Sequence, residues 1–337
     1  MFVDVLYGSS MTVESSEKER SGFAGWIAGN WFLFGMAVAM ALAFTFPRAS
    51  EEVGRLKSLV VASLIFFMGL TTDTHDFFRV FRRPGSLFLG IFLCYVISPL
   101  VVFPTGTLLF GAEEDRQLLI GVALVACATT TVATSVVYTR VAGGNQALAL
   151  TTSCLANVLS VVVTPLLLKL TLKTTVAVQA SGMIKKMMLL VLLPIIISQV
   201  TRKLMGKTAY KIAPASSRAA QVGILILIFI TTGGAQKVLT PAVVGKLAVL
   251  AAVCHTAVFL IGLGLGKAFG LARENTIGTA FAGSQKTLTT TTWLAKEYFT
   301  PGATIPIVVY HYVQLLIGHV FVRMLKKKGT SLVSGQN

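Results

Sequence analysis

The sequence predicts an all-α polytopic membrane protein of about ten transmembrane helices, arranged as two inverted five-helix repeats with broken helices 4 and 9. Three observations predict this fold class. Of the 337 residues, 54% are apolar and only 12% are charged, against roughly 25% charged in an average soluble domain. Apolar stretches long enough to cross a bilayer follow one another with short connections between them. The stretch beginning near residue 26 also has a counterpart 157 residues later, near residue 183.

One transmembrane transporter domain is expected over residues 26–325, with repeats of about 26–170 and 183–325. Residues 1–25 form an N-terminal tail and residues 326–337 a basic C-terminal tail. The expected helices are 26–46, 58–72, 86–109, 118–139, 146–170, 183–204, 218–239, 242–268, 275–298 and 303–325. Because five is an odd number, the second repeat enters the membrane from the opposite side, as is common among secondary transporters.

The charge distribution predicts the orientation of these helices. The formal charge is +16, but Lys and Arg are scattered through short loops instead of gathering on one face, which argues against nucleic-acid binding. Basic residues that flank apolar spans accumulate on the cytoplasmic side. The clusters at 79–83 and 326–328 therefore predict that both termini are cytoplasmic. The acidic start of the chain lacks the pattern of a signal peptide.

Helices 4 and 9 contain unusually polar stretches. Residues 127–135 read CATTTVATS and residues 283–292 read GSQKTLTTTT. Repeat transporters place their sites where helices break at the midplane, and hydroxyl groups are suitable partners for unwound backbone there. An alternative is that Ser and Thr only bond the carbonyl four residues back and pack one helix on another. The matching positions favour breaks.

Lys286 is the sharpest single signal. It lies eleven residues from Asn275 and ten from Lys296, about 15 Å from either helix end at ~1.5 Å per residue. A lysine at the bilayer centre costs about 2.5–3.5 kcal/mol on insertion scales, so it usually faces a cavity or a bundle interior. The alternative is a lysine nearer the interface than these boundaries place it. No Asp or Glu lies mid-span, and an ammonium among hydroxyls and helix N-termini suits an anionic solute.

Helix 5 contributes a further polar stretch, with Thr152, Ser153 and Asn157 able to face the break in helix 4 and Pro165 near the end of the span. These groups either complete a cation site built from hydroxyl, amide and carbonyl oxygens or pack helix against helix. The candidate substrate- and ion-binding residues are Thr130, Thr131, Thr134, Ser135, Thr152, Ser153, Asn157, Gly283, Ser284, Gln285, Lys286 and Thr287.

A coupling Na⁺ ion, if used, would contact Thr134, Ser135, Thr152 and Gln285; no other metal or cofactor is expected. Such a site lacks a carboxylate. The motifs HExxH and GxSxG are absent, and the histidines lack metal-ligand spacing, so the chain is not expected to be an enzyme. The histidines are interpreted as structural.

The segment Phe66–Leu70 (FFMGL), with Asp76-Phe77 and Arg82-Arg83-Pro84 after it, resembles the second-helix signature of the bile acid:sodium symporter superfamily. Three further stretches are similar to the branch containing solute carrier family 10 member 7: TRVAGGNQA at 139–147, TPLLL at 164–168, and GSQK at 283–286 followed by IVVYH at 307–311. The resemblance covers about residues 27–325. It implies ten helices as two inverted repeats, forming a panel and a core, with helices 4 and 9 crossing in the core.

The resemblance also implies sodium sites, but this chain departs from them. The glutamate that begins the family's helix 9 motif is replaced by Phe281, and the Gln-Asn pair that ends it is Gln285-Lys286. The helix 3 glutamine falls on Cys94, and the helix 4 motif keeps hydroxyls but loses its asparagine. We hypothesise that Lys286 permanently holds the positive charge that a bound sodium would provide.

The sequence therefore predicts a secondary-active transporter of a small, anionic organic solute that works by alternating access, without inherited Na⁺ coupling. The rival hypothesis follows from the resemblance, whose branch is associated with calcium homeostasis and the secretory pathway. It is a non-transporting regulator of cellular Ca²⁺ influx that binds protein partners. The expected location is the plasma membrane or a Golgi or endoplasmic-reticulum membrane, with the solute and the lipid bilayer as partners and no nucleic acid.

Overall fold

The structure is a computed structural model that describes residues 31–71, 84–111, 115–173, 178–206, 208–233 and 240–330. Within these residues every regular element is a helix. Six helices are long and apolar enough to cross a membrane, and a seventh span results if the pair Pro47–Gly54 and Lys57–Thr71, bent by 69°, is counted as one. The chain is therefore an integral multi-pass membrane protein.

The first half of the chain begins with α3, α4 and α5 and ends with the long helix α11. Its bounds are α3 Trp31–Thr45, α4 Pro47–Gly54, α5 Lys57–Thr71, α7 Pro84–Phe92, the π-helical turn η2 Leu93–Ile97, α8 Ser98–Phe110, α9 Arg116–Ala126, α10 Val132–Val141 and α11 Gln146–Thr171.

The second half has one π-helical turn of its own and ends with the long helix α18. Its bounds are α12 Ala180–Met187, the π-helical turn η4 Met188–Leu192, α13 Leu193–Met205, α14 Thr208–Gly233, α15 Pro241–Ala268, α16 Arg273–Ser284, α17 Thr289–Tyr298, the 3₁₀ turn η6 Pro301–Ala303 and α18 Thr304–Thr330.

Each expected range contains helix, and both expected breaks are present, between α9 and α10 and between α16 and α17. Two boundaries differ. The connection after α3 is itself a helix, α4, and α14 begins at Thr208 instead of near residue 218. The start of α14 is polar, and hydropathy finds only the membrane-buried part of a helix. Helix α18 continues to Thr330, whereas tail residues 1–25 and 331–337 lie outside the described residues.

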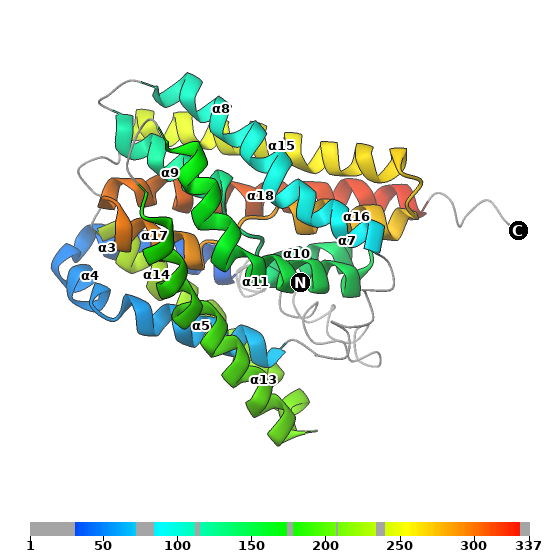
Figure 1. Ribbon diagram of the computed structural model, residues 1–337, viewed down its shortest axis with the longest axis horizontal. Helices are drawn as coiled ribbons and strands as arrows, with labels where there is room; N and C mark the ends of the chain where they lie inside the picture. Colours follow the sequence, from blue (N-terminus) through cyan, green and yellow to red (C-terminus); the bar gives the residue numbers. More distant parts are fainter. Residues whose placement is uncertain are drawn as a thin grey trace, which may run out of the picture.

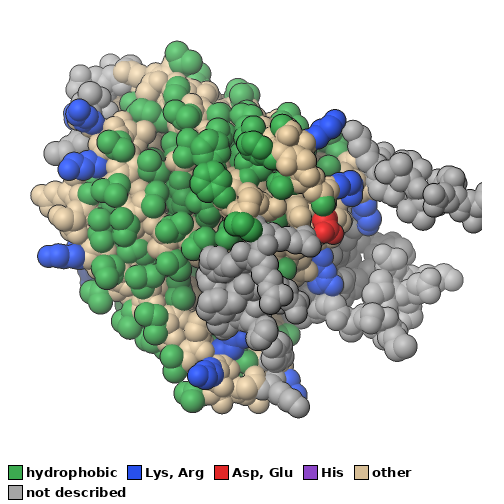
Figure 2. Space-filling view, turned by 45° about the vertical axis from the view of Figure 1, so that its right-hand side comes forward, with side chains coloured by type: hydrophobic (Ala, Val, Ile, Leu, Met, Phe, Trp, Pro, Cys, Tyr) green, Lys and Arg blue, Asp and Glu red, His purple; other side chains and the backbone are tan. Residues whose placement is uncertain are grey.

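The long helices α15 and α18 run side by side along the long axis of the molecule (Figure 1). The bundle has two ends, the Asn145 end and the Glu297 end. At the Asn145 end, the backbone N–H of Asn145 donates to the carbonyl of Glu274 at 2.8 Å. At the Glu297 end, Lys57 and Lys186 contact Glu297. Hydrophobic side chains cover the middle of the face in Figure 2, with Lys and Arg toward its margins, as expected for a bilayer-spanning surface.

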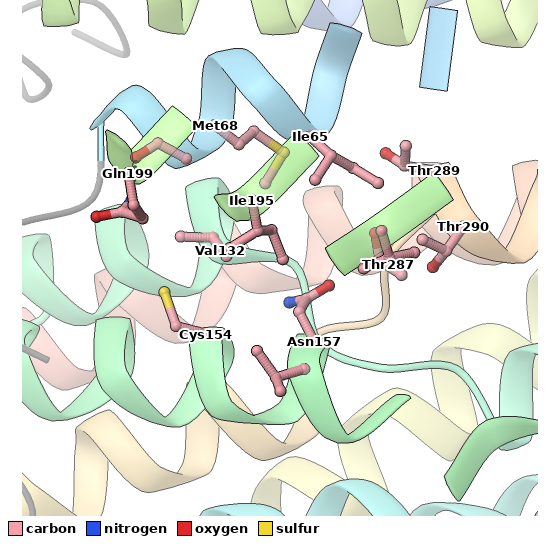
Figure 3. Close-up of a pocket in the computed structure, with 13 residues that line it drawn as sticks. Ile65, Met68, Val132, Cys154, Asn157, Ile195, Gln199, Thr287, Thr289 and Thr290 are labelled. Atoms are coloured by element: carbon pink, nitrogen blue, oxygen red, sulfur yellow. Dashed lines mark hydrogen bonds between the residues drawn. The ribbon is translucent and has the colours of Figure 1, made fainter. Parts of the chain in front are cut away.

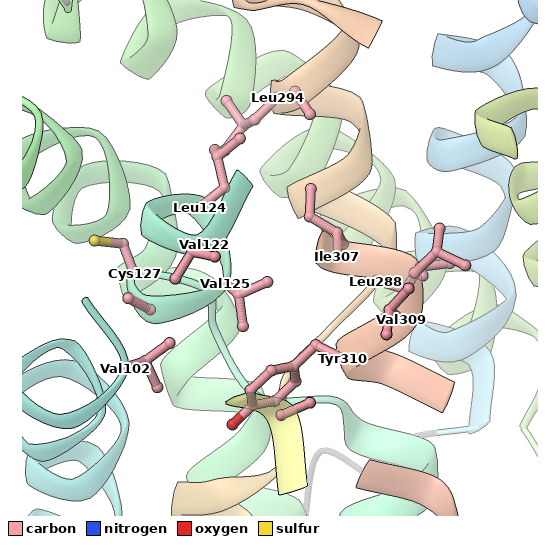
Figure 4. Packing of buried hydrophobic residues seen from close by; sticks show 14 of the residues in the cluster. Val102, Val122, Leu124, Val125, Cys127, Leu288, Leu294, Ile307, Val309 and Tyr310 are labelled. Atoms are coloured by element: carbon pink, nitrogen blue, oxygen red, sulfur yellow. The ribbon is translucent and has the colours of Figure 1, made fainter. Parts of the chain in front are cut away.

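The packed core lies where α9, α17 and α18 meet. Leu124 of α9, Leu294 of α17 and Ile307 of α18 belong to one buried cluster (Figure 4). Close helix contacts beside it depend on glycine: a Cβ on Gly283 would lie 2.5 Å from the Cβ of Leu93, and one on Gly90 would lie 2.5 Å from Cγ2 of Thr152. Gly283 thus lets α16 lie against η2, and Gly90 lets α7 lie against α11.

Candidate functional site

The two breaks cross each other at the centre of the core. The backbone N–H of Thr287, in the break after α16, donates to the carbonyl of Thr129, in the break after α9, at 2.9 Å. Helix α11 satisfies neighbouring carbonyls: Asn157 Nδ2 donates to Thr130 O at 3.0 Å and Thr164 Oγ1 donates to Cys127 O at 2.9 Å. Unwound backbone persists in a membrane only where protein or water supplies such partners.

Lys286 lies in this crossing and is 3% exposed. Its Nζ donates to the carbonyl oxygens of Cys94 and Ala128, each at 2.9 Å, and lies 3.6 Å from Cys94 Sγ. The side chain thus joins η2 to the break after α9. Carbonyl dipoles from two elements converge on one point, as they would around a bound cation.

The carbonyl of Cys94 is free to accept because η2 is a π-helical turn. The N–H of Ser98 bonds Leu93 O instead of Cys94 O. The next residue is Pro99, which has no N–H to donate. Cys94 O therefore has no partner within its own helix, and the Lys286 ammonium supplies one.

Gln314 of α18 forms hydrogen bonds with both the backbone N–H and the backbone carbonyl of Lys286. Its Oε1 accepts from Lys286 N at 2.8 Å, and its Nε2 donates to Lys286 O at 2.6 Å. The same Nε2 lies 2.9 Å from His311 Nδ1. His311 Nδ1 also lies 3.3 Å from Lys286 O. The contact with Gln314 needs Nδ1 as an acceptor and the contact with Lys286 O needs it as a donor, so His311 makes one or the other according to its ring tautomer.

The other predicted residues lie close around the crossing. Thr134 Oγ1 donates to Gln285 Oε1 at 3.2 Å, and Ser135 Oγ lies 2.9 Å from Ser153 Oγ. Ser135 also donates to Thr131 O at 2.6 Å, the carbonyl four residues back. The hydroxyls of Thr130, Thr152 and Ser284 are buried without a hydrogen-bond partner in the described part of the chain.

Two cavities adjoin the crossing. Cavity A has a volume of about 290 Å³; its lining is mostly apolar (Figure 3) and consists of Ile65, Met68, Gly69, Val132, Cys154, Asn157, Val158, Val191, Ile195, Gln199, Thr287, Thr289 and Thr290. Cavity B, of about 300 Å³, extends from the first turn of α17 to the exposed Gln146 at the Asn145 end, and His311 and Thr131 also line it. Thr287 and Thr289 line both cavities.

Lys286, which the sequence predicts among the binding residues, lines neither cavity A nor cavity B. Of the other predicted residues, Asn157 lines cavity A, Thr131 lines cavity B, and Thr287 lines both. Sequence reasoning missed Gln314 and interpreted His311 as structural. A signal was available, because these two polar residues lie three positions apart within an apolar span.

The sequence profile of the SBF-like CPA transporter family matches residues 30–327. The chain belongs to this transporter family. It is 26% identical over 312 residues to the uncharacterized sodium-dependent transporter YocS of Bacillus subtilis, covering 92% of this chain and 94% of that protein. It is 24% identical over 329 residues to the sodium/bile acid cotransporter 7 of Danio rerio, covering 90% and 96%. The counterpart in Mus musculus is 25% identical over 320 residues, covering 88% and 92%.

The resemblance found in the sequence motifs is thereby confirmed: this SBF-like transporter is a distant homologue of sodium/bile acid cotransporter 7 over most of its length. The family is one of transporters and not of enzymes. Membership implies a small-molecule solute as the partner of the site.

The candidate Na⁺ ligands of this SBF-like transporter fit a sodium ion poorly. Thr134, Ser135, Thr152 and Gln285 offer only neutral oxygens. Gln285 Oε1 already accepts from Thr134, and Ser135 is bonded to Thr131 O. The adjacent carbonyls of Cys94 and Ala128 are taken by the Lys286 ammonium. A second positive charge beside it, without a carboxylate, would be repelled in a medium of low dielectric constant.

Proposed function

We propose that this SBF-like transporter carries a small organic anion across its membrane by alternating access, with Lys286 in place of a coupling sodium ion. The observation that carries the proposal is the crossing of two broken helices at a hydrogen bond between Thr287 and Thr129, beside two cavities that share the lining residues Met68, Val132, Thr287 and Thr289. Transporters bind solutes where discontinuous helices meet near the midplane.

The anionic character of the solute is supported by the donors around the cavities. Helices α10 and α17 begin at Val132 and Thr289, and both residues line both cavities. The first N–H groups of a helix lack intrahelical acceptors and favour negative charge. His311 lines cavity B, and its Nε2 has no partner within the described residues, so the ring can donate to a solute when Nε2 carries the proton. A carboxylate would satisfy these donors together.

Independence from sodium is supported by the position of Lys286. The names of two relatives include sodium, but those names describe the relatives and not this chain. In this chain the ammonium of Lys286 donates to the carbonyl oxygens of Cys94 and Ala128, which are therefore not available to a sodium ion. A fixed positive charge would hold the two breaks together without a bound ion. Transport would then not be coupled to a sodium gradient, and the carrier would exchange one anion for another or carry anions down their own concentration gradient.

The finer architecture is part of the same proposal. Ten membrane-crossing helices in two inverted repeats are supported by helix at every expected range and by the opposite chain directions of the two broken helices. Gln117 at the start of α9 contacts Thr300 after the end of α17, and Glu274 at the start of α16 contacts Asn145 after the end of α10. We place both termini in the cytoplasm and the protein in the plasma membrane or a secretory-pathway membrane, on the basis of the basic clusters and the resemblance. The rival hypothesis, regulation of Ca²⁺ influx, gains no support from the family or from the relatives' names.

The test is uptake into proteoliposomes of a panel of radiolabelled hydroxy- and keto-carboxylates, with Na⁺ or choline as the outside cation. We expect uptake of at least one carboxylate at equal rates in both cations, and its loss in Lys286→Ala. Lys246→Ala, on the exposed side of α15, is the matched control and should transport normally. Uptake that follows a Na⁺ gradient and persists unchanged in Lys286→Ala would refute the role given to Lys286, and absence of uptake for every carboxylate would refute anion transport.

A further inference from the structure

We infer that Glu297, with Lys57 and Lys186, forms a gate that closes the cavities toward the Glu297 end and must open during the transport cycle. These three residues are called the Glu297 gate below. The inference rests on the proposed alternating access and identifies the residues that control one side of it.

The gate joins three elements that are distant in sequence. Glu297, in the last turn of α17, contacts Lys57 Nζ of α5 at 2.8 Å through Oε2 and Lys186 Nζ of α12 at 2.6 Å through Oε1. Lys57 also donates to the carbonyl of Lys296 at 3.3 Å. A single carboxylate therefore bridges two lysines on different helices, and none of the three residues lines cavity A or cavity B.

Neighbouring contacts hold the same helix end. Trp293 Nε1 donates to Ser58 Oγ at 3.0 Å, and Tyr298 Oη donates to the carbonyl of Gly182 at 3.1 Å. The ammonium of Lys186 lies 5.4 Å from the centre of the Tyr298 ring, within the range of a cation–π contact. Lys296 donates to the carbonyl of Ile230 in α14. The end of α17 is thus fastened to α5, α12 and α14.

Two of these helices, α5 and α14, are separated from α17 by space toward the other end. Cavity B lies between the start of α17 and the residues Thr71 at the end of α5 and Pro214 and Ser217 near the start of α14. The structure therefore holds α17 against its neighbours at the Glu297 end and apart from them toward the Asn145 end. Alternating access requires this asymmetry to reverse.

The strength of the gate suits a contact that opens. The side chains of Lys57, Glu297 and Lys186 are 23%, 22% and 56% exposed, so each ion pair is partly screened by water. Exposed pairs contribute little individually, and a network contributes more. The gate is accordingly strong enough to bias an equilibrium between two states and weak enough to break in each cycle.

A native cysteine, Cys154, can report from which end of the bundle cavity A is accessible. Cys154 lines cavity A, whereas Cys94, Cys127 and Cys254 are buried. Its reaction with a charged, membrane-impermeant methanethiosulfonate is measured by mass spectrometry in right-side-out and inside-out vesicles, with Cys154→Ala as the blank. In the wild type we expect labelling from the Asn145 end.

In Glu297→Gln, labelling from the Glu297 end should rise relative to labelling from the other end by about 5- to 30-fold, as loss of two partly exposed ion pairs allows. Glu52→Gln, an exposed glutamate of α4, is the matched control, and Glu297→Asp should retain most of the wild-type pattern. Thr290→Cys in a Cys154→Ala background is a second reporter in cavity A.

Unchanged sidedness of both reporters in Glu297→Gln overturns the gate. A variant that merely loses structure would lower labelling from both ends or expose the buried cysteines, and would not transfer labelling from one end to the other. The readout needs no solute, so a shift in sidedness without uptake of any carboxylate would support the gate while refuting the proposed solute class.

Discussion

At the scale of the residue, the central feature is a lysine whose partners are backbone carbonyls. Burying an ammonium in a membrane protein is costly unless its donors are satisfied. Lys286 meets that condition with Cys94 O and Ala128 O. Each carbonyl is available because the local helix is interrupted, by the π turn before Pro99 in one case and by the break after α9 in the other.

The first prediction follows from this dependence. Lys286→Met keeps an apolar side chain of similar length but leaves both carbonyls without a partner, at about 1–3 kcal/mol for each buried group left unpaired. We expect a lower melting temperature in detergent than the wild type, and no change in Lys246→Met, whose side chain is exposed. Equal melting temperatures for Lys286→Met and the wild type would show that the ammonium stabilises neither carbonyl.

At the scale of the element, much of the structure follows from local sequence. The hydroxyl-rich stretches predicted both breaks, because residues that compete with the helical backbone for hydrogen bonds weaken helices where they gather. The direction of the Lys286 side chain was not predictable in this way. Its acceptors come from η2 and from the break after α9, which meet only in the folded chain, where Gly283 lets α16 lie against Leu93 of η2.

Helix α4 and the early start of α14 were not predicted, because both segments are polar. Pro47–Gly54 is a short helix that contains Arg48, Glu51 and Glu52, and hydropathy does not distinguish such a polar segment from a loop. The role of Gln314 was missed because its spacing of three residues from His311 indicates a shared helix face but does not show which backbone that face contacts. Its two bonds to Lys286 appear only in the folded chain.

The packing of α7 on α11 gives the second prediction. Gly90→Ala would place a methyl group 2.5 Å from Cγ2 of Thr152, and such overpacking costs about 1–3 kcal/mol. Thr152→Ser removes the clashing methyl, so the double variant should recover most of the lost melting temperature. Gly264→Ala, with nothing within 4 Å of the new Cβ, is the control and should be neutral. Failure of Thr152→Ser to rescue Gly90→Ala would contradict this packing.

At the scale of the whole molecule, the two ends of the bundle differ in composition. Exposed basic side chains at the Asn145 end include Arg140, Lys267, Arg273, Arg323 and Lys326. Each end also has a carboxylate, Glu274 at the Asn145 end and Glu297 at the other, but the basic cluster at 79–83 follows the end of α5 in the sequence, and that helix ends beside cavity B toward the Asn145 end. Because Lys and Arg are retained on the cytoplasmic side, this difference predicts that the Asn145 end faces the cytoplasm and that the gate faces the opposite compartment.

The orientation can be measured with two cysteines on opposite ends of the bundle. Lys267 and Lys169 are both exposed and lie in the last turns of α15 and α11, which run in opposite directions. In a Cys154→Ala background, Lys267→Cys should react with an impermeant maleimide only in inside-out vesicles and Lys169→Cys only in right-side-out vesicles. Labelling of both from one side would place these ends on the same face and contradict the spanning arrangement. If Lys267→Cys reacts only in right-side-out vesicles and Lys169→Cys only in inside-out vesicles, the bundle is inserted the other way round. The Glu297 gate would then face the cytoplasm, because it lies at the same end of α17 and α5 in either orientation.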